Sequence, residues 1–199
     1  MRVLLIDHGC CDHPHTRVHA LCTGLLAAGC RAAACGPSTV PGLERQPAGL
    51  HGIHLHDVAA ATNASGVPAR LLGLVRETAR QTIAEATDDL VPDAIFVLHA
   101  GILADLAVET GVPVVVHVAA ADLDAAGRRP SLRRLVAAAI GSSELVVAAD
   151  ETAAATLRDS WLDADAAEPE RVETWPAAAD SAAAIAAACR RAVARRRGE

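Results

Sequence analysis

The stretch Met1-Arg2-Val3-Leu4-Leu5-Ile6-Asp7 contains four consecutive apolar residues, Val3 to Ile6, and ends at a carboxylate. An uninterrupted apolar run of this length is typical of a strand that is covered on both faces of a parallel sheet. A secretory signal peptide needs a longer apolar region and a cleavage site of small residues, which this stretch lacks. We therefore interpret it as a buried strand.

The residues that follow predict a loop and then an amphipathic helix. Val18, Leu21, Cys22, Leu25 and Leu26 are spaced i, i+3, i+4, i+7 and i+8, which gives one apolar stripe. His15 or Thr16 stands near the expected start of the helix. Gly29 stands where a helix commonly ends in the left-handed conformation.

The same alternation of short apolar runs and helical patterns continues along the chain. It predicts an α/β fold: one Rossmann-like domain over residues 1–199, with a mostly parallel central sheet of about seven strands and helices on both faces. The expected strands are Val3–Ile6, Arg31–Cys35, Gly52–His56, Ala94–Leu98, Val114–Val118, Glu144–Ala148 and Val172–Trp175. After the first helix, further helices are expected over Pro68–Thr87, Ile102–Glu109, Leu132–Ile140, Glu151–Trp161 and Ser181–Arg195.

Composition excludes several classes of function. The formal net charge of -6 argues against non-specific nucleic-acid binding, which needs a basic surface. No apolar run approaches the roughly 20 residues of a membrane span. Without a leader sequence, the six cysteines are expected as thiols in a reducing compartment, which predicts a cytoplasmic protein.

The order of several segments resembles the N-terminal domain of GT-B fold glycosyltransferases of the family-4 type. The similarity covers roughly residues 1 to 180. It is carried by Met1–Ile6 with Leu25–Cys30, by Pro92–His99, by Gly111–Val116 followed by Asp122-Leu123, by Ser142–Glu151, and by Glu170–Pro176 with Asp180.

This resemblance implies the acceptor-binding half of an enzyme that transfers sugar from a nucleotide-activated donor. The family's second domain, which supplies most of the donor site, is missing, so we expect a split or degenerate enzyme. Its partners would be a small-molecule acceptor and a second chain carrying a GT-B C-terminal half. Residues 181–197 would match the helix that in the family crosses back onto the first domain.

The resemblance also has departures at the expected site. The family's paired glycines fall on Asp12 and His13, and its reaction-centre histidine falls on Ala119. Ligands of open parallel sheets bind beyond the carboxyl ends of the strands, which indicates the loop from Asp7 to Arg17 and the residues after the fourth and fifth strands. The candidate catalytic residues are therefore Asp12, His13, His99 and Asp122, and the candidate substrate-binding residues are His8, Cys10, Cys11, His15, Arg17 and Ala119.

Two other chemistries remain open for the His- and Cys-rich segment 8–19. His13 and His15, together with His8 or His99, could hold a divalent transition metal. Cys10 or Cys11 could act as a nucleophile. Solvated loop histidines around a half-buried thiol explain the same residues more simply. A non-catalytic partner or binding module on this fold is a further alternative, and a homo-oligomer is left open.

Four further residues carry weaker expectations. Asp122 and Asp124 follow the fifth strand, where they either hold an acceptor's hydroxyl or cap the next turn. His117 lies inside that strand and is expected as a core histidine with satisfied hydrogen bonds. Trp175 is expected to pack in the core.

Overall fold

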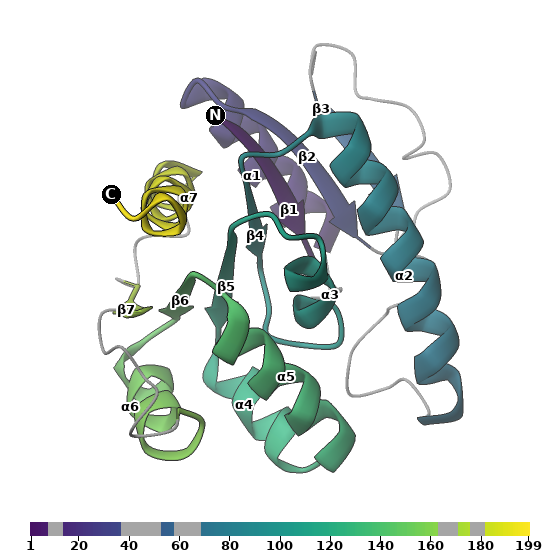
Figure 1. Cartoon of the computed structure of the whole chain (residues 1–199), viewed down its shortest axis with the longest axis vertical. Helices are drawn as coiled ribbons and strands as arrows, with labels where there is room; N and C mark the ends of the chain where they lie inside the picture. The colour runs from purple at the N-terminus through teal and green to yellow at the C-terminus, as the bar shows by residue number, and fades with distance from the viewer. Residues whose placement is uncertain (8–13, 37–52, 58–68, 163–170, 176–181) are drawn as a thin grey trace.

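A computed structural model describes residues 1–7, 14–36, 53–57, 69–162, 171–175 and 182–199 (Figure 1). Within them, seven strands form one sheet in the order β3-β2-β1-β4-β5-β6-β7, and every neighbouring pair is parallel. The strands are β1 (Arg2–Ile6), β2 (Arg31–Gly36), β3 (Ile53–Asp57), β4 (Ala94–Val97), β5 (Val114–Val118), β6 (Leu145–Ala148) and β7 (Val172–Thr174). The predicted α/β fold with about seven parallel strands is confirmed.

Seven helices accompany these strands in the described part of the chain. They are α1 (Pro14–Ala27), α2 (Ala69–Leu90), α3 (Ala104–Glu109), α4 (Ala120–Gly127), α5 (Pro130–Ser142), α6 (Glu151–Ser160) and α7 (Ala182–Arg197). None of these helices combines the length and apolar character that crossing a membrane requires.

β1 lies inside the sheet, between β2 and β4, and is covered on both faces. Its side chains alternate between the two cores: Val3 and Leu5 point to one side, and Leu4 and Ile6 point to the other. All four are fully buried. This explains why the opening stretch is apolar without alternation.

The helices form one layer on each face of the sheet (Figure 1). α1 and α7 pack together on the face that holds Val3 and Leu5, and α2 to α6 cover the opposite face. α1 buries the predicted stripe, with Leu21, Cys22 and Leu25 at its centre. Gly29 follows α1 with a φ of 75°, as expected of a residue that ends a helix.

α7 lies within the stretch expected for the closing helix, 181–197, and packs against β4, β5 and β6 as well as α1. The α1–α7 contact is close: a Cβ added at Gly24 would lie 2.6 Å from the Cβ of Ala182. This part of α1 therefore has room only for a residue without a side chain.

The structure differs from the sequence prediction at one element. Ala120–Gly127 forms the helix α4, where only a turn after the fifth strand was expected. Its fully buried apolar residues are Leu123 and Ala126, too few to give a visible helical stripe. This helix matters for the site because Asp122 belongs to its first turn.

Candidate functional site at the carboxyl edge of the sheet

The strand order places a topological switch point between β1 and β4. From β1 the chain adds β2 and β3 on one side, and then returns to add β4 to β7 on the other. In open parallel sheets, the crevice beyond the carboxyl ends of the strands at such a point is the usual ligand site. Asp7 directly follows β1, and His99 stands two residues after β4, so both lie at this point.

Asp7, His99 and Asp122 form one cluster there, which we call the rim cluster. The His99 Nδ1 atom lies 3.6 Å from Asp122 Oδ1, and His99 Nε2 lies 4.0 Å from Asp7 Oδ1. The side chains of His99, Asp122 and Asp7 are only 9%, 8% and 1% exposed. An imidazole thus lies between two buried carboxylates, one directly after β1 and the other in the first turn of α4.

Asp122 has two contacts with different chemistry. Its Oδ2 atom accepts a hydrogen bond of 3.0 Å from the backbone N–H of Ala119, and its Oδ1 atom faces His99. The first contact caps α4, since the early N–H groups of a helix have no partner within it. The expected capping role of Asp122 is therefore confirmed, and its other oxygen remains directed at the imidazole.

A second imidazole supports the segment that carries His99. The carbonyl oxygen of Leu98 lies 3.0 Å from the Nδ1 atom of His117. A carbonyl only accepts, so this contact assigns the proton to Nδ1 of His117. His117 is half-buried rather than fully buried, and its polar contact agrees with the expected satisfied histidine.

Most of the chain's few aromatic residues gather beside this histidine. The chain has one Phe, two Trp and no Tyr. The ring of Phe96 lies 6.5 Å from that of His117 and 5.8 Å from that of Trp175, and the His117 and Trp175 rings are 6.1 Å apart. The His99 and His117 rings are 6.5 Å apart, so the aromatic group adjoins the rim cluster.

The rim cluster is arranged for proton transfer at a hydroxyl group. His99 Nε2 and Asp7 Oδ1 are 4.0 Å apart, and an unprotonated Nε2 can accept the single O–H of a hydroxyl group bound there. A neighbouring carboxylate that orients the imidazole is the usual support for a histidine base. Asp122 is in position to orient His99 after a small rotation of the ring.

The structure brings together some predicted site residues and leaves others undescribed. His99 and Asp122 lie together as expected, with Ala119 beside them through its hydrogen bond to Asp122. His15 and Arg17 belong to α1, but their side chains are not among the described ones. The remaining candidates lie outside the described residues: His8, Cys10, Cys11, Asp12 and His13.

Asp7 was missed as an individual site residue, although the loop that it opens was expected at the site. The available signal was a single carboxylate directly after a buried strand at the switch point. Within the described residues, no group of three or more His, Cys, Asp or Glu side chains is arranged to hold a metal ion. The metal prediction for His8, His13 and His15 involves side chains outside that description and stays a prediction.

Comparison with known proteins finds similarity in three dimensions. No family model and no curated protein sequence matches the chain. A structure of sucrose-phosphate synthase from Thermosynechococcus elongatus matches with a TM-score of 0.63 and 13% identity, covering 94% of this chain and 95% of that one. UDP-GlcNAc 2-epimerase from Neisseria meningitidis, bound to UDP-GlcNAc, matches with a TM-score of 0.56 and 14% identity, covering 87% of this chain and 46% of that one.

A longer structure of the same synthase has a TM-score of 0.62 and 13% identity, over 88% of this chain. The chain spans about half of this structure and of the epimerase, 48% and 46% of their lengths. At such identities the likeness shows the fold alone. The chain therefore has a GT-B-like, Rossmann-like half-domain fold.

Proposed function

We propose that the chain is a glycosyltransferase-like protein that acts as the acceptor-binding half of a split or degenerate GT-B enzyme. The observation that carries the proposal is His99 held between Asp7 and Asp122 at the switch point of a GT-B-like sheet. The acceptor is a small molecule with a hydroxyl group. The sugar comes from a nucleotide-activated donor held mainly by a second chain with a GT-B C-terminal half.

In this proposal His99 is the general base. The acceptor hydroxyl donates its hydrogen bond to His99 Nε2, beside Asp7, and its proton passes to Nε2 as the oxygen attacks the anomeric carbon of the donor. The bond from that carbon to the nucleotide diphosphate breaks, and the diphosphate leaves with the electron pair. Asp122 holds the Nδ1 side of the ring, so that Nε2 faces the acceptor.

The proposal also accounts for the alanine at a position where the related family has histidine. The side chain of Ala119 is a methyl group, which takes no proton. Its backbone N–H nevertheless positions Asp122, which faces His99 on the neighbouring strand's end. The base is thus supplied from the end of β4 instead of the end of β5.

The test has two parts. First, the tagged chain is purified from its native host, and co-purifying proteins are identified; we expect a chain with a GT-B C-terminal half. Second, sugar transfer is measured for the reconstituted pair with labelled nucleotide sugars. His99→Asn should lower kcat by about 10²- to 10⁴-fold, the usual contribution of a general base, with little change in KM.

Asp124→Asn is the matched control, because Asp124 lies on the same helix with its side chain 61% exposed and paired with Arg128. This variant should keep full activity. A His99→Asn protein with wild-type kcat would refute the role of His99. Absence of both partner and transfer would refute the enzyme and favour a non-catalytic binding module.

A further inference from the structure

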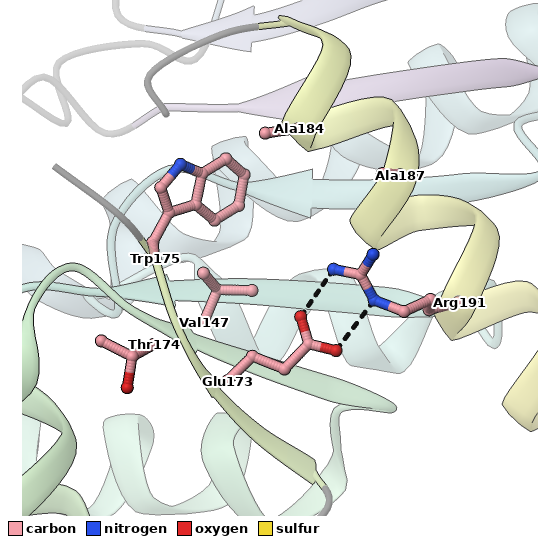
Figure 2. Close-up of a pocket in the computed structure, with 7 residues that line it drawn as sticks. All are labelled: Val147, Glu173, Thr174, Trp175, Ala184, Ala187 and Arg191. Atoms are coloured by element: carbon pink, nitrogen blue, oxygen red, sulfur yellow. Dashed lines mark hydrogen bonds and ion pairs between the residues drawn. The ribbon is translucent and has the colours of Figure 1, made fainter. Parts of the chain in front are cut away.

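A pocket of about 140 Å³ lies between β7 and α7 (Figure 2). It is lined by Val147 of β6, by Glu173 and Trp175 at β7, and by Ala184, Ala187 and Arg191 of α7. None of these residues belongs to the rim cluster. Trp175 separates the two places, since its ring also contacts His117 and Phe96.

Trp175 carries a buried hydrogen-bond donor beside this pocket. Its indole Nε1 is buried and has no hydrogen-bond partner among the residues that the structure describes. Leaving a buried donor unpaired costs about 1–3 kcal/mol, so native proteins rarely keep one without a reason. Because this atom has almost no accessible surface, a ligand in the pocket would meet the face of the indole ring and not its N–H.

The charged residues of the pocket neutralise each other. Arg191 donates two hydrogen bonds to the Glu173 carboxylate, of 2.8 Å from Nε and 2.5 Å from Nη2, as Figure 2 shows. An anionic ligand would have to compete with Glu173 for the Arg191 guanidinium. A cationic ligand would have to compete with Arg191 for the Glu173 carboxylate. The half-exposed pair still offers guanidinium N–H groups and carboxylate lone pairs, which suit the hydroxyl groups of a neutral molecule.

Apart from Thr174, the rest of the lining is apolar. The indole ring of Trp175 stands next to Ala184 in Figure 2, across from the ion pair. An aromatic face of this kind packs against the C–H groups of a saturated ring. The volume is below the 300–1,000 Å³ that is typical of pockets for larger ligands, so a single ring fits best.

We propose that the β7–α7 pocket binds one neutral, polyhydroxylated ring of about the size of a monosaccharide. The ring lies against the face of the Trp175 indole, and its hydroxyls contact Glu173 and Arg191. This site is separate from the proposed reaction centre at His99.

The experiment follows the indole N–H resonance of Trp175 by NMR. Trp161→Phe assigns the resonance, since the chain has two Trp. The probes are methyl glucoside and methyl galactoside, which are neutral, and glucose 6-phosphate, which is anionic. We expect a saturable shift with a neutral glycoside, with Kd on the order of 1 mM, and weaker binding of the phosphate.

Two variants test the residues. Glu173→Gln should weaken the neutral glycoside about tenfold, equal to about 1.4 kcal/mol. Trp175→Leu should abolish binding measured by calorimetry; if it does not fold, Glu173→Gln decides. Glu109→Gln is the matched control, because Glu109 forms a similar half-exposed pair with Arg80 on the other face of the molecule, and it should bind like the wild type.

No saturable shift with either neutral glycoside would overturn the proposal, as would tighter binding of the phosphate or unchanged binding by Glu173→Gln. His99→Asn separates this proposal from the proposed function. It should leave glycoside binding at Trp175 unchanged while removing transfer. If the chain binds a glycoside but shows no sugar transfer, the proposal for the β7–α7 pocket stands and only the proposed enzymatic function is rejected.

Discussion

Asp122 offers a sharp test, because its two oxygens have separable roles. Asp122→Ala removes the acceptor for the Ala119 N–H at 3.0 Å and leaves the first turn of α4 uncapped. Loss of such a cap costs about 1 kcal/mol, within a range of about 0.5–2 kcal/mol. In a domain of this size, 1 kcal/mol lowers Tm by about 2–4 °C.

Asp122→Asn keeps an oxygen for the Ala119 N–H but removes the charge that faces His99. We expect its free energy of unfolding to stay within a few tenths of a kcal/mol of wild type, because the hydrogen bond that caps α4 is kept. Its transfer activity should still fall at least about tenfold, which corresponds to about 1.4 kcal/mol in the barrier. Stability and activity thus separate in the Asn variant and fall together in the Ala variant.

The assays are calorimetric unfolding and the reconstituted transfer reaction. Asp124→Asn is the control, since its exposed pair with Arg128 is worth only about 0.3–0.5 kcal/mol. Equal destabilisation by Asp122→Ala and Asp122→Asn would refute the capping argument, because the charge and not the hydrogen bond would then stabilise α4. Full activity in Asp122→Asn would refute the orienting role.

Two further predictions concern packing and the thiols. Gly24→Ala should destabilise the fold by about 1–3 kcal/mol, because the new Cβ would meet Ala182 at 2.6 Å. Gly73→Ala, in open space on α2, should stabilise the fold by about 0.5–1 kcal/mol. Urea unfolding should therefore rank Gly73→Ala above wild type and wild type above Gly24→Ala, and equal effects of the two substitutions would contradict the prediction. Burial raises the pKa of the Cys22 thiol from its ordinary 9.0 to about 12 and also raises the pKa of Cys189, so neither should react with a thiol reagent in the native state at pH 8. Because the unfolded chain releases these protons near pH 9 and the folded chain retains them, stability should fall as pH rises above 9, by up to about 1.4 kcal/mol per pH unit for each thiol; a flat stability between pH 8 and pH 11 would count against burial of the thiols.

The sheet could be predicted from the sequence because its strands are continuous apolar runs. Val3–Ile6 and Val114–Val116 are apolar at every position. A strand has this pattern when both faces of its sheet are covered. α4 could not be predicted, since Leu123 and Ala126 are its main apolar contacts and alanine fills both exposed and buried positions in this chain. Its helical state depends on the cap from Asp122 and on packing against α5.

The rim cluster was partly predictable. His99 and Asp122 were expected because each follows a strand, and the edge of a parallel sheet gathers such residues. The β7–α7 pocket was not, because Glu173 and Arg191 are brought together only by the way α7 lies across the sheet. No spacing rule within one helix or strand relates residues on two such elements.

The position of β1 between β2 and β4 has a consequence for how the chain folds during synthesis. β1 pairs with β2 along one edge. Its other edge pairs with β4, which comes much later in the chain, as in the pairing of Val3 with Ala94. Parallel pairings over such long sequence separations form slowly. A nascent chain that stops before Ala94 therefore has an apolar strand with one open edge, which favours aggregation and creates a need for chaperone protection until β4 emerges.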